Sequence, residues 1–185
     1  MTIIVPSRIV WDVETKYYVD DPYDAELSTI TMIDTEKPGH IMYYEESEIN
    51  EAIRIMLASP GLVGFNSKAF DIPVLMKYVD RGHGRKLRAK PHFDIYDEFM
   101  RKYQRRISLA NMSRNTLVAG KFDLVTDTAT SMWKTDPWKL YQYNAWDTYV
   151  TYLLYVHVCS FGYLNFKLPT LRRFTPETIS RPGMT

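Results

Sequence analysis

The segment IIVPSRIVWDVE (residues 3–14) is the part of the sequence from which the fold follows most directly. Apolar and β-branched residues dominate it, so we predict a strand over Ile3–Val13. Val10, Asp12 and Glu14 hold alternating positions. Side chains two residues apart leave a strand on the same face, about 7 Å apart along it. The strand should therefore end with two carboxylates that point to one side.

The rest of the chain alternates between strand-like and helix-like patterns. Further strands are predicted at four places: Leu27–Asp34, His40–Tyr44, Leu62–Phe65 and His92–Tyr96. Helices are predicted from Ile49 to the stop at Ser59-Pro60-Gly61, over Phe70–Val79, over Ser108–Val118, and from the N-cap Asp136-Pro137 to Gly162. Arg81–Lys90 is predicted to be a loop. These elements indicate a single α/β domain over residues 1–174, with a mixed sheet flanked by helices and a C-terminal tail over 175–185.

The composition indicates a globular protein of a reducing compartment. A chain of 185 residues can bury roughly 70% of its unfolded surface. No apolar run reaches the roughly 18 residues that a membrane helix needs, and the first residues lack the basic start of a secretory signal. Cys159 is the only cysteine, which excludes an internal disulfide. We therefore predict a cytoplasmic protein that has no membrane partner.

Charge is divided unevenly along the chain, although the net charge is only +1. The first 60 residues contain twelve Asp and Glu against four Lys and Arg, whereas the remainder contains ten against nineteen. The densest basic stretch runs from Arg81 to Arg106. A solvated surface explains such a run equally well, but a basic stretch beside an acidic site also attracts phosphate groups. Within this stretch, the residues predicted to contact a polyanionic substrate are Arg85, Lys86 and Arg88.

Asp12 and Glu14 are the first candidates for chemistry. Two carboxylates aimed at one point repel each other, and a cation between them removes the repulsion. Hard oxygen ligands of this kind suit Mg²⁺ or Mn²⁺. The same Asp-x-Glu spacing begins at Asp24 and at Asp34. Those pairs fall at turns or strand ends, where solvated surface charge is the simpler explanation.

A second group of candidates lies in GFNSKAFDIPVL (residues 64–75), where a predicted strand gives way to a helix. Asp71 could serve only as a helix N-cap, a role that Asp often fills. A cap requires neither the Gly-Phe-Asn turn nor the second Phe just before Asp71, and these residues suit a site where aromatic rings stack on bases. The candidate substrate-binding residues are therefore Phe65, Asn66 and Phe70.

The third group is the pair Tyr143 and Asp147 on the last predicted helix. Residues four apart are neighbours on a helix, about 6 Å apart along its axis, so these two share a face. Val150 and Leu154 continue that face, which places Asp147 at the head of an apolar stripe. A buried, unpaired carboxylate is costly and needs a partner or a metal ion. Asp147 therefore joins the candidate metal ligands.

The order of the three groups resembles that of the DEDD superfamily of 3′→5′ exonucleases, which have a ribonuclease-H-like fold. A strand Asp-x-Glu is followed by Asn-x₄-Asp and then by a helical Tyr-x₃-Asp, as in the DEDDy subgroup. The other subgroup requires His at the position of Gln142. The pattern Gly-Phe-Asn-x₃-Phe-Asp-x-Pro-x-Leu is most similar to the proofreading domain of family B DNA polymerases. The likeness extends from about Arg8 to Tyr155 in a chain too short for a polymerase domain, so a stand-alone exonuclease is expected.

The resemblance implies a two-metal-ion mechanism with Mg²⁺ or Mn²⁺. Asp12, Glu14 and Asp147 would bind the ion that lowers the pKa of the attacking water. Asp12 would also reach the second ion, which Asp71 would hold partly through water. Tyr143 would orient the attacking water. The substrate would be a DNA end, single-stranded ahead of double-stranded, and the product a nucleoside 5′-monophosphate.

Three alternatives remain at this point. An RNA-trimming enzyme of the same fold is one, because no residue can be assigned to a 2′-hydroxyl. A catalytically silent nucleic-acid-binding module is disfavoured because all four carboxylates and Tyr143 are present. An endonuclease of the same fold is disfavoured by the ordered Tyr-x₃-Asp. The expected partners are nucleic acid, with DNA ahead of RNA, and a replication or repair protein.

Overall fold

The protein is built around a five-stranded mixed sheet. A computed structural model describes residues 5–117 and 129–177. The strands of the sheet are β1 (Ile9–Thr15), β2 (Leu27–Asp34), β3 (Ile41–Glu45), β4 (Leu62–Gly64) and β5 (His92–Asp94). Their order is β3-β2-β1-β4-β5, in which the pairs β1–β2 and β2–β3 are antiparallel and the pairs β1–β4 and β4–β5 are parallel. The predicted α/β class with a mixed sheet is confirmed.

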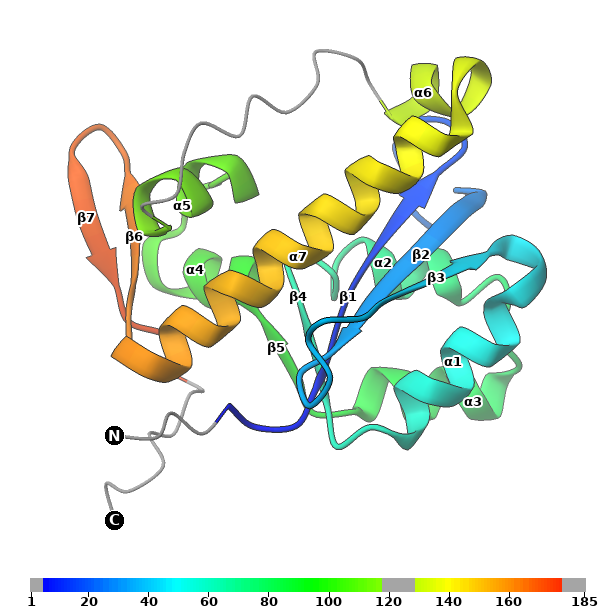
Figure 1. The fold of residues 1–185 in the computed structure, drawn as a ribbon, viewed down its shortest axis with the longest axis horizontal. Helices are drawn as coiled ribbons and strands as arrows, with labels where there is room; N and C mark the ends of the chain where they lie inside the picture. Colours follow the sequence, from blue (N-terminus) through cyan, green and yellow to red (C-terminus); the bar gives the residue numbers. More distant parts are fainter. Residues whose placement is uncertain (1–4, 118–128, 178–185) are drawn as a thin grey trace.

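Helices connect and flank these strands. They are a 3₁₀ turn η1 (Glu46–Glu48), α1 (Ile49–Ala58), α2 (Asp71–Leu75), α3 (Arg81–Ala89), α4 (Ile95–Tyr103), α5 (Leu109–Thr116), α6 (Ala129–Thr135) and α7 (Pro137–Phe161). Figure 1 shows α7 running diagonally across the sheet. None of the helices in the described ranges is long and apolar enough to cross a membrane.

The predicted limits of α7 are confirmed. The Asp136 side chain accepts the backbone N–H of Lys139, and Pro137 follows it in the first turn. At the other end, Gly162 takes the left-handed conformation with φ 77° and terminates the helix. A cap, a first-turn proline and a final glycine are the usual signals for helix ends. These local signals therefore fix the helix that carries Asp147.

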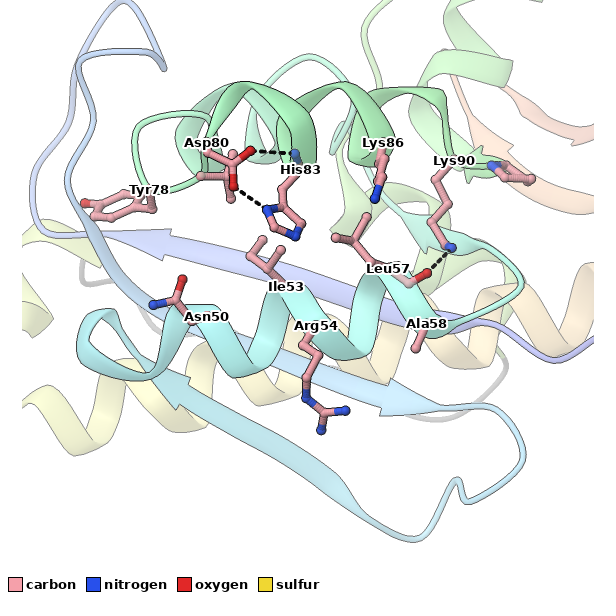
Figure 2. A pocket seen from close by; sticks show the side chains of 12 residues that line it. Asn50, Ile53, Arg54, Leu57, Ala58, Tyr78, Asp80, His83, Lys86 and Lys90 are labelled. Carbon is pink, nitrogen blue, oxygen red and sulfur yellow. Dashed lines mark hydrogen bonds and ion pairs between the residues drawn. The ribbon is translucent and has the colours of Figure 1, made fainter.

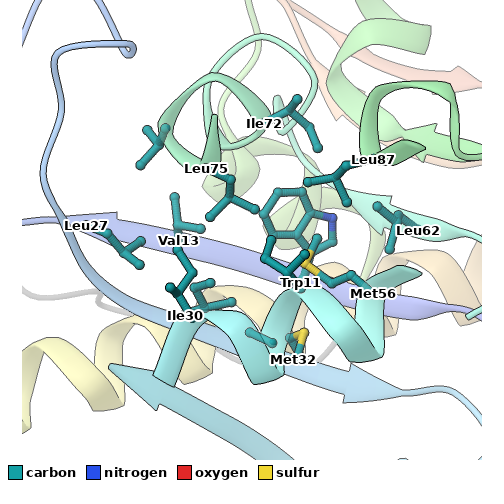
Figure 3. Packing of buried hydrophobic residues seen from close by; sticks show 14 of the residues in the cluster. Trp11, Val13, Leu27, Ile30, Met32, Met56, Leu62, Ile72, Leu75 and Leu87 are labelled. Carbon is teal, nitrogen blue, oxygen red and sulfur yellow. The ribbon is translucent and has the colours of Figure 1, made fainter. Parts of the chain in front are cut away.

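Two hydrophobic clusters attach the helices to opposite faces of the sheet. On one face, Trp11 and Val13 of β1 lie in a cluster with Met56 of α1 and Leu87 of α3 (Figure 3). On the other face, Val10 belongs to a cluster formed with α4, α5 and α7. Burying one large apolar side chain completely stabilises the folded state by about 1.5–3 kcal/mol. Because successive side chains of β1 enter opposite clusters, the residues that share a side with Val10 face α7.

The segment Arg81–Lys90, predicted to be a loop, instead forms a helix, α3. It contains two glycines, each of which disfavours a helix interior by about 1 kcal/mol. However, the Asp80 carboxylate accepts two backbone N–H groups of the first turn, and Leu87 is only 1% exposed. The cap and the burial of Leu87 together outweigh the glycines.

The prediction for His92–Tyr96 is also corrected. The strand ends at Asp94, whose side chain caps α4, and the chain passes directly into this helix. An acidic first turn after Asp94 is typical of a helix start. The strand-like pattern of His92–Tyr96 was given more weight than this signal.

The predicted limits of other elements also differ from the structure. Within the described residues, the first strand begins at Ile9, and residues 5–8 are not part of it; the predicted start at Ile3 lies outside the described residues. The helix predicted over Phe70–Val79 is regular only over α2. Val118, predicted to end a helix, and residues 178–185 of the predicted tail lie outside the described residues.

A hairpin of β6 (Leu164–Lys167) and β7 (Leu171–Phe174) follows α7 and was not predicted. Phe166 and Phe174 pack edge-on against Phe99 of α4. The hairpin therefore extends the hydrophobic cluster on the α7 face of the sheet.

Candidate functional site

Three carboxylates from β1 and α7 meet on the face of the sheet that α7 covers. Asp12 and Glu14 follow Val10 on that face of β1, and Asp147 comes from the middle of α7. One oxygen atom from each carboxylate lies within 4.8 Å of the other two. A strand and a helix that are far apart in the sequence thus direct three hard oxygen donors to one point.

Burial raises the pKa of all three carboxylates, and repulsion from neighbouring charges adds to it for Asp12 and Glu14. For Asp12, burial is the largest cause of the raised pKa, followed by the charges of Asp71, Glu14 and Asp147. Burial also raises the pKa of Glu14, again with repulsion from Asp147 and Asp71. Burial raises the pKa of Asp147 to about 6, while the Tyr143 hydroxyl acts in the opposite direction. Ionising the whole cluster is therefore costly, and a bound cation offsets that cost.

Asp71 lies beside the three carboxylates but is held differently. Its Oδ1 accepts the backbone N–H of Val13 at 2.9 Å, and the side chain is 3% exposed. The strand β4 pairs with β1 only at Ile9 and Val10, so the N–H of Val13 lies beyond the end of that ladder. Asp71 supplies the acceptor that β4 does not. The predicted alternative, a helix N-cap, is wrong, because Phe70 holds the cap position of α2.

Asn144 is a buried residue of the site that the sequence analysis missed. Its Nδ2 donates to Oδ2 of Asp12 at 2.8 Å, and this bond opposes the rise in the pKa of Asp12. The Asn144 backbone carbonyl accepts the hydroxyl of Thr31 on β2, which is also bonded to the hydroxyl of Thr148. These bonds fix α7 over the sheet at the level of Asp12. A polar residue beside Tyr143 on a largely apolar helix was the available signal.

Tyr143 lies one helical turn before Asp147. Burial raises the pKa of its phenol, and the negative charges of Asp147, Glu14 and Asp12 raise it further. The hydroxyl therefore stays protonated at neutral pH and can donate a hydrogen bond. The structure thus places a neutral donor at the edge of the acidic cluster.

The residues between β4 and α2 form a tight loop beside the carboxylates. Asn66 has φ 65°, a left-handed conformation that Asn adopts more readily than most residues. Its side chain is partly exposed, as are Phe65 and Phe70. Phe65 also contacts the ring of Tyr96 on α4, with ring centroids 5.6 Å apart. The three candidate substrate residues are therefore accessible from solvent in the segment that leads to Asp71.

The three predicted basic contacts do not lie on one side of α3. Arg81, Arg85 and Arg88 line one small cavity with Met76 and Val79, which follow α2, whereas Lys86 lines a different cavity toward α1. Arg88 also borders a cavity of about 350 Å³ that reaches Lys68 in the loop after β4. Arg88 is therefore the predicted contact that is most directly connected to this loop.

The cavity toward α1 has a volume of about 690 Å³ and contains none of the carboxylates. Figure 2 shows that it lies between α1 and α3, on the face of the sheet opposite α7. The Lys90 ammonium donates to the Leu57 carbonyl at 2.6 Å, and His83 is bonded to Asp80. Because these polar groups are already partnered and distant from the acidic cluster in the fold, we assign the cavity no catalytic role.

The donor set fits a divalent cation. Asp12, Glu14 and Asp147 supply only hard oxygen atoms, which Mg²⁺ and Mn²⁺ prefer. Oδ1 of Asp147 is buried and has no hydrogen-bond partner among the described residues. An orphaned carboxylate oxygen that faces two other carboxylates is well suited to bind a cation.

Comparisons with known proteins identify a family for this chain. Residues 39–165 match the family described as a predicted 3′–5′ exonuclease related to the exonuclease domain of PolB. The match includes Asp71, Tyr143 and Asp147, but not Asp12 or Glu14, which the fold brings to Asp147. No curated protein matches the chain.

Two solved structures are similar in fold. A family B DNA polymerase from the hyperthermophilic archaeon Pyrobaculum calidifontis has a TM-score of 0.64 and 15% sequence identity; the match covers 82% of this chain and 24% of the polymerase. Exonuclease I has a TM-score of 0.50 and 14% identity, with 83% of this chain and 41% of exonuclease I covered. The chain thus spans less than half the length of either structure.

The sheet order, the helix that covers the carboxylates and these neighbours define a ribonuclease-H-like fold. The chain belongs to the family of PolB-related 3′–5′ exonucleases. The expected DEDD-type exonuclease class and the expected fold are thereby confirmed.

Proposed function

We propose that this exonuclease removes nucleotides one at a time from the 3′ end of DNA and releases nucleoside 5′-monophosphates. Single-stranded ends are the preferred substrate, and two Mg²⁺ or Mn²⁺ ions are the cofactors. The observation that carries this proposal is the convergence of Asp12, Glu14 and Asp147 within 4.8 Å. The preference for DNA is supported by the polymerase among the similar structures.

Each residue of the site has a distinct proposed task. Asp12, Glu14 and Asp147 would hold one cation, and Asp12 together with Asp71 would hold the second. A divalent cation bound there lowers the pKa of a water molecule and neutralises charge on the phosphate. The protonated Tyr143 hydroxyl orients the attacking water. The terminal nucleotides contact Asn66 and the rings of Phe65 and Phe70.

Several features around the site complete the proposal. The catalytic domain extends over residues 1–174 and is followed by a tail over 175–185. Arg85 and Arg88 of α3, together with the neighbouring Arg81, contact substrate phosphates, whereas Lys86, which lines a different cavity, does not. The protein acts in the cytoplasm and works with a replication or repair protein.

The test is digestion of 5′-labelled single- and double-stranded DNA and RNA with Mg²⁺, with Mn²⁺ or with EDTA. We expect a ladder shortened from the 3′ end of single-stranded DNA, monophosphate products and no cleavage in EDTA. Faster digestion of RNA than of DNA would show that RNA is the preferred substrate. Internal cuts in a circular single strand would contradict the exonuclease assignment.

Asp147→Ala should lower the turnover rate by several orders of magnitude and leave the fold intact. The carboxylate would be a direct cation ligand, and no neighbouring group can replace it. Steady-state kinetics and circular dichroism would measure the two effects. Glu36→Ala, which removes an exposed carboxylate from a turn, is the matched control. Near wild-type turnover of Asp147→Ala would contradict the assignment of the metal site.

A further inference from the structure

Asp94 lies at the end of β5 and connects two segments through one buried carboxylate. Its Oδ1 accepts the backbone N–H of Asn66 at 2.9 Å, together with those of Tyr96 and Asp97 at 3.0 and 3.1 Å. Its Oδ2 accepts the N–H of Lys68 at 2.8 Å. The Asp94 side chain is 1% exposed, and both oxygen atoms have donors. One carboxylate therefore caps α4 and binds the loop that follows β4.

The capping role does not explain the bonds to the loop. A helix N-cap needs only the first-turn N–H groups, and those come from Tyr96 and Asp97. The bonds to Asn66 and Lys68 join residues 26 to 28 positions away in the sequence. They hold the backbone on both sides of Ser67, and Asn66 is the residue with φ 65°. Asp94 thus stabilises a loop conformation that few residues adopt without support.

The same loop is packed tightly and leads directly to α2. A Cβ atom at Gly64 would lie 2.0 Å from the Ser67 hydroxyl, so only glycine fits there. Ser67 is fully buried, and its carbonyl accepts the N–H of Ile72 in α2. The backbone held by Asp94 therefore determines where Asn66 lies and is coupled to the start of α2.

We propose that Asp94 is a positioning residue for substrate binding: it holds the loop so that Asn66, Phe65 and Phe70 meet the 3′-terminal nucleotides. The inference rests on the proposed function, because it assigns those side chains to the nucleic acid. Asp94 itself touches neither the substrate nor the cations. Its loss should therefore weaken nucleic-acid binding much more than the chemical step.

Two substitutions separate the cap from the loop. Asp94→Asn retains one oxygen atom for Asn66 and the cap, but turns an amide donor toward the N–H of Lys68. Asp94→Ser retains a good N-cap but is too short to reach the loop. Asp97→Asn is the matched control, because the Asp97 side chain is 43% exposed and pairs with the Lys68 ammonium at 3.0 Å.

The experiment measures five quantities for the wild type and the three variants. Fluorescence anisotropy gives the Kd for a 5′-labelled single-stranded oligonucleotide in Ca²⁺, and initial rates in Mg²⁺ give KM and kcat. Calorimetry gives the Mn²⁺ affinity, and thermal unfolding gives Tm. Asp94→Ser should raise Kd and KM by about tenfold or more, with kcat and Mn²⁺ affinity within about threefold of wild type. Asp94→Asn should show the same pattern with a smaller increase, and Asp97→Asn should match the wild type.

Three results would overturn the inference. A lower Tm with unchanged Kd and KM would make Asp94 a structural cap only. If the affinity for Mn²⁺ fell by the same factor as the affinity for the oligonucleotide, Asp94 would act through the carboxylates of the acidic cluster. A wild type that neither binds nor cleaves nucleic acid would refute the proposed function as well. If Asp94→Ser does not fold, the nearly isosteric Asp94→Asn decides between these results.

Discussion

Asn144 determines how one of the candidate ligands is presented. Its amide is fully buried between α7 and the sheet and donates to Asp12, while Oδ1 of Asn144 has no partner among the described residues. A carboxylate that binds a metal is usually held by an outer hydrogen bond of this kind. Asn144 therefore belongs to the candidate metal site, because its side chain holds Asp12.

Asn144→Ala should weaken Mn²⁺ binding by about 10–100-fold, the usual effect of losing such a partner. Calorimetry at pH 7.5 measures this, and kcat/KM at subsaturating Mn²⁺ should fall in parallel. Asn50→Ala, in an exposed position of α1, controls for the loss of an Asn side chain. Wild-type Mn²⁺ affinity in Asn144→Ala would show that Asp12 does not depend on this bond.

Tyr143→Phe isolates the phenol hydroxyl from the ring. If the hydroxyl orients water while the cation activates it, kcat should fall by on the order of 10–10³-fold. Mn²⁺ affinity should stay within a factor of two or three, because the hydroxyl is not a ligand. A large loss of Mn²⁺ affinity would instead place Tyr143 among the groups that hold the cation.

The helix α3 has a buried apolar side, and its basic residues lie on more than one of its other sides. Leu87 is buried against the sheet, and the arginines 81, 85 and 88 follow one another at helical spacing on a different face from Lys86. If that stripe contacts substrate phosphates, each contact releases counterions from the strand. The stripe should then affect binding without affecting cleavage.

Replacing Arg81, Arg85 and Arg88 together by Ala should raise KM several-fold and leave kcat within a factor of a few. The slope of log affinity against log salt should flatten by about two, since each phosphate contact on a single strand contributes about 0.7. Binding titrations between roughly 50 and 300 mM NaCl measure this slope, because salt screening of charges changes strongly over that range. Lys86→Ala should leave the slope unchanged. An unchanged slope in the triple variant would show that these arginines do not contact substrate phosphates.

For the whole molecule, the acidic cluster couples stability to pH and to metal. Burial first, and repulsion from Asp94 in addition, raise the pKa of Asp71 from 3.8 to about 7, and burial raises that of Asp147 from 3.8 to about 6. Between about pH 4 and pH 7 these two carboxyl groups therefore bind more protons in the folded protein than in the unfolded chain. Their contribution to the free energy of unfolding falls as pH rises through this window, and the raised pKa values of Asp12 and Glu14 act in the same direction. Burial of His92, which lowers its pKa to about 3, opposes this trend.

In EDTA, Tm should decrease as pH rises from about 4.5 to about 7.5. Saturating Mn²⁺ should reverse this trend, because binding to the folded state alone adds about 2.7 kcal/mol at 100 times Kd. Scanning calorimetry with and without Mn²⁺ measures both effects. Asp147→Asn should flatten the dependence in EDTA and reduce the gain from Mn²⁺. A Tm in EDTA that rises with pH over this window would contradict the raised pKa values of these carboxylates.

Local patterns were sufficient for the elements that carry the site. The alternation along β1 placed Asp12 and Glu14 on one face, because the side-chain period of a strand leaves no other arrangement. The caps and the terminal glycine of α7 placed Asp147 one turn after Tyr143. The predictions that were wrong concerned segments with conflicting local signals. In α3, two glycines disfavour a helix, whereas a cap and one buried leucine favour it.

Chemical type and strand or helix periodicity are properties of neighbouring residues, so the sequence alone determined the α/β class, the candidate ligands and the exonuclease resemblance. Only the tertiary structure decided that Asp71 accepts the N–H of Val13, that Asn144 holds Asp12, and that Asp94 binds the loop around Asn66. Each of these contacts joins residues more than 25 positions apart. No local pattern encodes such a contact, because it exists only after the sheet and its helices have packed and buried both partners together.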